Sequence, residues 1–241
     1  MKTRAFSAFP KEGLQFLRSL KRNNNREWFQ DHKSIYEQHV KQPIGDLIEA
    51  LAGDFKKFAP EMIATPKISA YRIYRDTRFS KNKSPYKTHA AAIFPREGLG
   101  KHAGAALYLH IAPSELLIGG GLYMPVPDDL RIVRQRIAES PDAFLKVVRN
   151  RQFRKLFGDL AGEKLTRVPR GFSADHPAAE YLKYKSLLAA REFPAETATS
   201  ARFYGLTLET FKAILPLIRF INDPIYAARR VQQRKEALLG L

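Results

Sequence analysis

The sequence predicts an α+β fold, a single domain in which an antiparallel β-meander is covered by N-terminal and C-terminal helices. Three observations predict it. Residues 1–65 carry apolar residues at helical spacing, residues 66–125 hold short β-branched and aromatic runs with short turns, and residues 126–241 are mainly helical in pattern. Because the sequence shows neither repeats nor a long linker, we expect one domain over 1–241.

The N-terminal layer begins with a helix marked by Leu14, Leu17 and Leu20. Asn24, followed three residues later by Glu27, is typical of a helix start at which side chains satisfy free backbone amides. Pro43 ends or restarts the helix that follows. At three- and four-residue spacing, one face of the helix before Pro43 holds Trp28, His32, Ile35, Tyr36 and His39. The amphipathic period then continues through Ile44, Leu47, Ile48, Leu51, Phe55 and Phe58.

The meander is predicted to contain four strands, at 68–79, 88–94 and in a hairpin over 104–123. The hairpin turn is expected at Pro113-Ser114-Glu115. Alternation along the first hairpin arm places Leu107 and Leu109 on one face and Tyr108 and His110 on the other.

The C-terminal part begins with two helices, opened by Pro127 and by Ser140-Pro141. Residues 164–172 are predicted to be extended, and Asp175-His176-Pro177 leads into a helix over 178–189. A further helix at 207–221 is expected to be broken by Pro216, and a separate basic helix ends the chain.

The composition restricts the class of protein. Lysine and arginine number 41 against 24 acids, a net charge of +17, which favours contact with polyanions such as nucleic acid over a purely solubilising role. The chain has no cysteine, which excludes disulfides and thiolate chemistry and suits a reducing compartment. The pattern shows neither a secretory leader nor a membrane span, so we expect a cytoplasmic protein without membrane partners.

The charge is concentrated in residues 72–89, RIYRDTRFSKNKSPYKTH, which we call the basic stretch. It holds six lysines and arginines and one acid, and such crowded cations repel unless a negative ligand compensates them. On a strand, Asp76 faces the same way as Arg78 and can orient its guanidinium toward a phosphate. The predicted ligand-binding residues are Arg72, Arg75, Asp76, Arg78, Lys81, Lys83, Tyr86 and Lys87.

Three hypotheses follow for this stretch. The first is that it binds a phosphate-bearing ligand such as nucleic acid. The second is an enzyme acting on a small phosphorylated substrate, with Asp76 or His89 as the catalytic proton carrier. The third is that the stretch is a structural hub of ion pairs, in which case replacing Arg75 would lower stability by several kcal/mol, roughly 3–5 for a buried pair.

The motif Arg72-x-x-Arg75-Asp76-x-Arg78-Phe79, with Lys83 and Tyr86 following, resembles the domain-of-unknown-function family 2461. The resemblance extends over nearly the whole chain, through the runs NNREWF at 24–29, SPYKT at 84–88, GGGLYMP at 119–125 and DHP at 175–177. It implies membership and marks the motif residues as positions of interest, and it brings no assigned activity.

Other chemistry finds little support in the sequence. The glycine run at 119–121 lacks the spacing and lysine of a phosphate-binding loop, so a bulge or close backbone crossing is favoured. The histidines form no recognised ligand motif, although His89, His102 and His110 lie on or near the sheet. A G-x-S-x-G elbow is missing. We therefore predict neither a metal site nor a cofactor.

Overall fold

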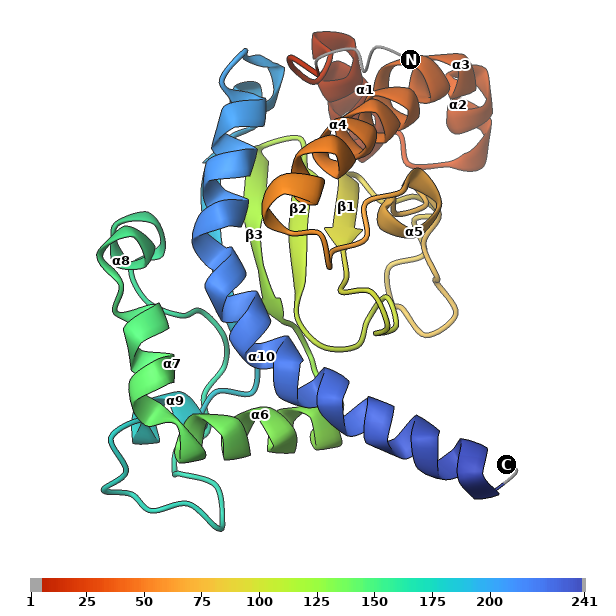
Figure 1. Cartoon of the computed structure of the whole chain (residues 1–241). Coiled ribbons are helices and arrows are strands. Elements are labelled where there is room, and N and C mark those ends of the chain that lie inside the picture. The colour runs from red at the N-terminus through yellow and green to blue at the C-terminus, as the bar shows by residue number, and fades with distance from the viewer. Residues whose placement is uncertain (1–5, 240–241) are drawn as a thin grey trace. The chain divides into compact units, whose positions relative to one another are not determined.

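The computed structural model describes residues 6–239. Within them the chain forms helices and a four-stranded antiparallel sheet in the order β1-β2-β3-β4, which confirms the α+β class (Figure 1). The strands are β1 (Ala90–Phe94), β2 (Ala106–Ile111), β3 (Glu115–Leu122) and β4 (Leu187–Pro194). The residues group into two compact units, and β2, β3 and β4 each contribute to both.

Unit 1 comprises 6–94, 108–118 and 191–210. Its helices are α1 (Lys11–Arg22), α2 (Arg26–Asp31), α3 (Lys33–Tyr36), the π-helical η1 (Glu37–Lys41), α4 (Gln42–Phe58), α5 (Pro66–Ser69) and the 3-10 helix η2 (Ala195–Thr199). The apolar face of α4 is buried as its spacing predicts, and α4 packs on β1 (Figure 1). Phe55 meets Phe94 edge to face at 5.2 Å, which anchors the helical layer on the sheet.

Unit 2 comprises 95–107, 119–190 and 211–239. Its helices are α6 (Pro127–Glu139), α7 (Pro141–Val148), α8 (Arg151–Phe157), α9 (Ala179–Leu182) and most of α10 (Phe203–Leu239). The prolines at 127 and 141 stand at the first helical positions, as predicted. A Cβ at Gly119 or Gly121 would overlap a carbonyl oxygen of β4, and Gly121 has φ 130°. The glycines therefore let strands approach closely, which supports the structural interpretation of this run.

Three secondary-structure predictions were wrong. Residues 68–79 are not a strand: the segment begins in α5 and then runs extended, with single bridges at Ala70 and Tyr74. Residues 187–194 form β4 instead of continuing a helix from α9, because Leu187 and Ala189 are buried on one face of the sheet. Finally, α10 runs unbroken through Pro216. Burial of Leu215 and Leu217 around the proline offsets the roughly 3 kcal/mol that a proline costs in a helix interior.

The extended region 164–172 forms no strand either, apart from a bridge between Lys164 and Tyr184. The hairpin agrees with prediction: β2 and β3 flank a turn closed by the Ala112 amide, which donates to the Glu115 carbonyl at 2.8 Å. Across residues 6–239, no helix is both long enough and apolar enough to traverse a bilayer.

Candidate anion-binding site

The basic stretch folds back on itself as a short two-stranded ribbon. The Arg75 amide donates to the Pro85 carbonyl at 2.9 Å, and the Lys87 amide donates to the Ile73 carbonyl at 2.7 Å. Tyr74 and Tyr86 form the antiparallel bridge between these two bonds. Residues 76–84 are thereby closed into a loop, which we call the tip. Although 70–78 is not a strand, exposure still alternates along it, and Arg72, Tyr74, Asp76 and Arg78 all face solvent.

Asn24 completes the hydrogen bonding at the base of this ribbon. Its amide nitrogen donates to the Tyr86 carbonyl at 2.9 Å, and its amide oxygen accepts from the Tyr86 backbone N–H at 3.0 Å. Tyr86 is only 3% exposed, and its ring stacks on Phe29 at 4.1 Å. The helix cap predicted at Asn24 is instead Asn25, whose side chain accepts from the Trp28 amide. Tyr86 therefore positions the stretch from inside, whereas the sequence predicted it as a ligand-binding residue.

Several cations of the stretch hold the tip through neutral oxygens. Arg75 donates to the Ser84 carbonyl at 3.2 Å and to the Ser80 hydroxyl at 3.3 Å. Lys83 donates to the Thr77 carbonyl at 3.0 Å. Lys87 donates to the Arg72 carbonyl at 3.1 Å. These bonds order the backbone without neutralising the positive charge, so they differ from the ion-pair hub of the third hypothesis.

The stretch contains one carboxylate, that of Asp76, and Arg78 forms an ion pair with it. Arg78 donates through Nε to Asp76 Oδ1 at 3.0 Å and through Nη2 to Oδ2 at 2.7 Å. Hydrogen bonding by Arg78 lowers the pKa of Asp76 to about 2, so this carboxylate is ionised near neutral pH. The geometry suits Asp76 as an orienting group for Arg78 better than as a proton carrier.

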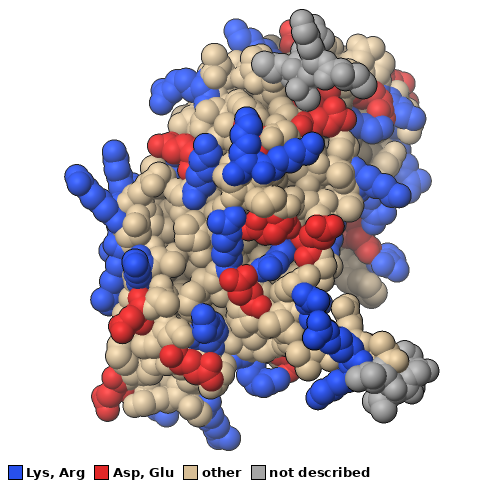
Figure 2. Space-filling view, in the orientation of Figure 1, with Lys and Arg blue, Asp and Glu red and all other residues tan. Residues whose placement is uncertain are grey.

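The remaining positive groups of the stretch are exposed to solvent, and so is one aromatic ring. Arg72 and Lys81 are exposed, and their side chains make no hydrogen bond or ion pair to any of the residues 6–239. Phe79 is 95% exposed, and the Arg78 guanidinium lies 5.8 Å from its ring centre. A turn closed by the Ser80 amide on the Thr77 carbonyl ends the alternation just before this ring. On the face that Figure 2 shows, by contrast, lysines and arginines are interspersed with acids.

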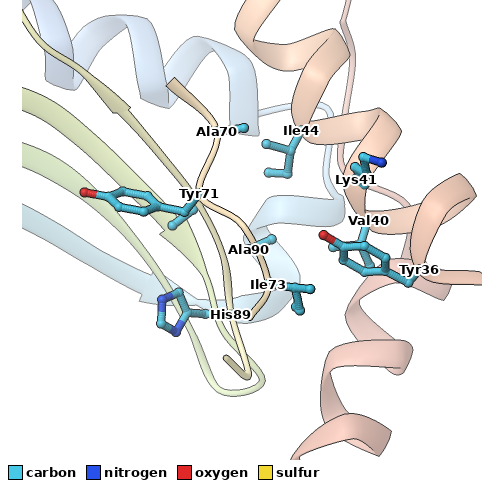
Figure 3. A pocket seen from close by; sticks show the side chains of 10 residues that line it. Tyr36, Val40, Lys41, Ile44, Ala70, Tyr71, Ile73, His89 and Ala90 are labelled. Atoms are coloured by element: carbon cyan, nitrogen blue, oxygen red, sulfur yellow. The ribbon is translucent and has the colours of Figure 1, made fainter. Parts of the chain in front are cut away.

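His89, the other predicted proton carrier, lies beside a small cavity of about 30 Å³, room for one or two water molecules (Figure 3). Tyr71 and His89 project to one side of the 70–73 segment, and Tyr36, Val40 and Ile44 lie on the other side. The cavity is lined by neither Arg75 nor Asp76, and it is too small for a phosphorylated metabolite. Burial, then the neighbouring His110, lowers the pKa of His89 to about 4.

A family model described as "Conserved hypothetical protein (DUF2461)" matches residues 12–220, which include the whole basic stretch. The chain belongs to the DUF2461 family. No curated protein and no solved structure matches this chain. The family description assigns no activity to the DUF2461 fold.

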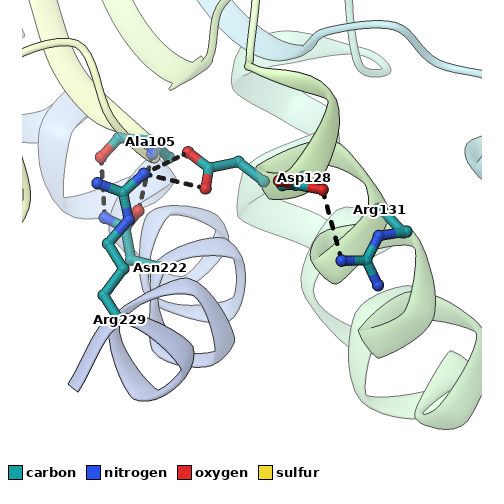
Figure 4. Close-up of polar contacts among 6 residues, drawn as sticks. Ala105, Asp128, Arg131, Asn222 and Arg229 are labelled. Carbon is teal, nitrogen blue, oxygen red and sulfur yellow. Dashed lines mark hydrogen bonds and ion pairs between the residues drawn. The ribbon is translucent and has the colours of Figure 1, made fainter. Parts of the chain in front are cut away.

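Elsewhere in this DUF2461 chain, three arginines of the C-terminal helices have partners of their own. Arg229 donates to both carboxylate oxygens of the buried Asp129 at 3.1 Å, and Arg131 pairs with Asp128 at 3.5 Å (Figure 4). Arg134 donates to two backbone carbonyls. These three guanidinium groups are therefore bonded within the fold.

The sheet of this DUF2461 chain also carries a polar cluster that the sequence did not predict as a site. Tyr108 and His110 share a face of β2, as their alternation predicted, and Glu115 at the start of β3 bonds to His110. His89 and His110 do converge, with ring centres 5.5 Å apart, whereas His102 is exposed. Groups of three or more His, Asp or Glu residues suited to a metal are not found among the described residues. The sequence signal for this cluster was the two-residue spacing of Tyr108 and His110, which puts both side chains on one face of the strand.

Proposed function

We propose that this protein binds a phosphate-bearing polyanion, single-stranded nucleic acid, through the tip and base of the basic stretch. The observation that carries the proposal is the 95% exposed ring of Phe79, which has the Arg78 guanidinium 5.8 Å from its centre, in a stretch where Arg72 and Lys81 are exposed as well. Water does not favour a fully exposed phenyl ring, and a strongly basic neighbourhood favours anions. A ligand that is both aromatic and polyanionic satisfies the two together.

Single-stranded nucleic acid has this combination. Its phosphates suit cations that lie along the backbone, and its bases stack on aromatic side chains with about 1–3 kcal/mol per base. Arg72 and Lys81 supply charge that no hydrogen bond or ion pair within the described residues takes up, although Arg72 lies near enough to Asp76 to help lower its pKa. Arg78, held as a planar fork by Asp76, presents its remaining donors in a fixed direction. Phe79 supplies the stacking face.

The other predicted ligand-binding residues then act by holding the tip in shape. Arg75, Lys83 and Lys87 bond to backbone carbonyls, and Tyr86 packs beneath the ribbon. Their charges add to the local potential even where their donors are occupied. The arrangement separates residues that contact the ligand from residues that order the loop.

Fluorescence anisotropy with a fluorescein-labelled oligothymidylate of about 20 nucleotides, at low salt, tests the proposal. We expect binding, and we expect Phe79→Ala to weaken it by about 5- to 100-fold, as the loss of one stacked base predicts. Arg72→Gln with Lys81→Gln should weaken it further. The matched control is Lys11→Gln with Lys56→Gln, which removes the same charge from exposed sites in unit 1.

The contradicting outcomes are distinct. If the wild-type protein does not bind the oligonucleotide, or if both charge variants weaken binding equally, the stretch is not the site. Vesicles of phosphatidylserine and phosphatidylcholine form a further arm. Binding to these vesicles without binding to the oligonucleotide would assign the exposed ring and cations to a membrane surface instead.

A further inference from the structure

Three side chains on the β2–β3 hairpin form a directed chain of hydrogen bonds. The Tyr108 hydroxyl lies 3.1 Å from His110 Nδ1, and His110 Nε2 lies 3.0 Å from Glu115 Oε1. An ionised carboxylate only accepts, so the neutral imidazole carries its proton on Nε2. Nδ1 then has a lone pair, and the Tyr108 hydroxyl donates to it. The order is hydroxyl, imidazole, carboxylate, which is the order that activates a hydroxyl nucleophile.

The fold partly shields this chain of hydrogen bonds from water, since the Glu115 side chain is 37% exposed. The opposite face of β2 is the core, where Leu107 and Leu109 are fully buried. The side chain of His110 keeps 16% of its exposure, and Tyr108 is half-buried. Partial burial strengthens the imidazole–carboxylate interaction.

Neighbouring groups supply charge and keep the imidazole free to accept a proton. Tyr71 meets Tyr108 edge to face at 6.3 Å, and Lys87 Nζ lies 4.9 Å from the Tyr71 ring centre. The basic stretch therefore reaches the edge of the cluster. His89 faces His110, and burial lowers the pKa of His89 to about 4, so His89 is neutral near pH 7 and does not oppose a positive charge on His110.

We infer that Tyr108, His110 and Glu115 form a catalytic site in which the Tyr108 oxygen attacks the phosphorus of a phosphate ester. The O–P bond to Tyr108 forms while the bond to the leaving oxygen breaks. The phenol proton passes to His110 Nδ1 and from there to the leaving oxygen. Glu115 is a positioning residue that holds the imidazole. Only the choice of a phosphate ester rests on the proposed function; the reactivity of Tyr108 does not.

Labelling with phenylmethanesulfonyl fluoride tests the reactivity without a known substrate. The Tyr108 oxygen would bond to sulfur, fluoride would leave, and the proton would go to His110. Peptide mass spectrometry gives the rate at each tyrosine. Tyr123 is the internal control: it is 68% exposed and makes no hydrogen bond to the described residues. We expect Tyr108 to be labelled faster than Tyr123 despite its lower exposure.

The variants separate chemistry from folding. His110→Gln should slow labelling of Tyr108 by about 10²-fold, as loss of a general base predicts. Glu115→Gln keeps an acceptor for Nε2–H but removes the charge, so it should slow labelling and shift its pH profile while Tyr123 is unaffected. If Tyr108 is labelled no faster than Tyr123, or at the same rate in all variants, the three residues only brace the hairpin.

A second arm uses the p-nitrophenyl ester of thymidine 5′-monophosphate. A burst of about one p-nitrophenolate per chain, lost in Tyr108→Phe, is the expected result. Sulfonyl labelling without a burst overturns the assignment of phosphate ester as substrate. If the protein does not bind the oligonucleotide but Tyr108 is still labelled selectively, the proposed function is refuted. The inference that the Tyr108 hydroxyl is activated then still holds.

Discussion

Asn24 offers the sharpest test of how the basic stretch is held. Asn24→Ala removes the two hydrogen bonds, at 2.9 and 3.0 Å, that satisfy the backbone of the buried Tyr86. A buried N–H or C=O left without a partner costs about 1–3 kcal/mol, so the free energy of unfolding should fall by about 2–4 kcal/mol. With a urea m-value of about 2–3 kcal/mol/M, the unfolding midpoint should drop by about 1 M.

The neighbouring asparagines are matched controls for this substitution. Asn25 caps α2 through the Trp28 amide, and replacing it should cost about 1 kcal/mol. Asn23 donates to the Ser19 carbonyl from an exposed position, and replacing it should cost no more than about 0.5 kcal/mol. Urea unfolding followed by circular dichroism ranks the three. An Asn24→Ala midpoint equal to that of Asn23→Ala would refute the clamp.

Three further predictions concern the rest of the chain. Folded His89 stays neutral down to pH about 4 whereas the unfolded chain protonates it near 6.5, so the unfolded state binds more protons and stability is lost as pH falls between these values. The loss of unfolding free energy should be roughly 1–3 kcal/mol after allowance for partial exposure, and it should be smaller in His89→Gln. Equal urea midpoints at pH 7 and pH 5 in the wild-type protein would contradict this prediction. Gly121→Ala should destabilise the protein by roughly 2–4 kcal/mol because Gly121 has a positive φ and lies close to the backbone of β4. Gly45→Ala, in α4, should stabilise it by about 0.5–1 kcal/mol, since nothing lies near the added methyl group. Thermal melting measures both, and a change of the same sign in both variants would be inconsistent with the β3 geometry. Arg229→Met leaves the Asp129 carboxylate buried without its partner and should lower the free energy of unfolding by about 1–3 kcal/mol. Adding Asp129→Asn should restore part of this stability. A double mutant no more stable than Arg229→Met would argue against the ion pair.

Local patterns in the sequence were sufficient for elements whose core face repeats regularly. The helical spacing of α4 and the alternation along β2 each predicted which residues share a face, because both faces are set by the period of the backbone. The proline-led starts of α6 and α7 were predicted for the same local reason.

Elements that depend on distant partners were not predicted. β4 pairs with β3, from which it is separated by more than sixty residues, and its sequence LLAAREFP has helix-forming residues that the sheet overrides. α10 continues through Pro216 because apolar residues on both flanks are buried, which the sequence around the proline does not reveal.

The sequence marked the basic stretch, but it did not predict what each of its side chains contacts in the fold. The cation count marked the stretch, and alternation correctly put Asp76 beside Arg78. The conformation of the tip determines the rest: Arg75 and Lys83 donate to backbone carbonyls, and Phe79 points outward. Asn24 and Tyr86 lie 62 positions apart, so their pairing also required the structure.

The salt dependence of oligonucleotide binding tests most directly whether an external anion compensates the cations of the basic stretch. Log Kd plotted against log salt concentration should rise linearly, and Arg72→Gln with Lys81→Gln should lower its slope by about 1.4, roughly 0.7 for each lost phosphate contact on a single strand. The Lys11→Gln, Lys56→Gln control should keep the wild-type slope. A slope near zero, or one that the two pairs of substitutions change equally, would contradict the account.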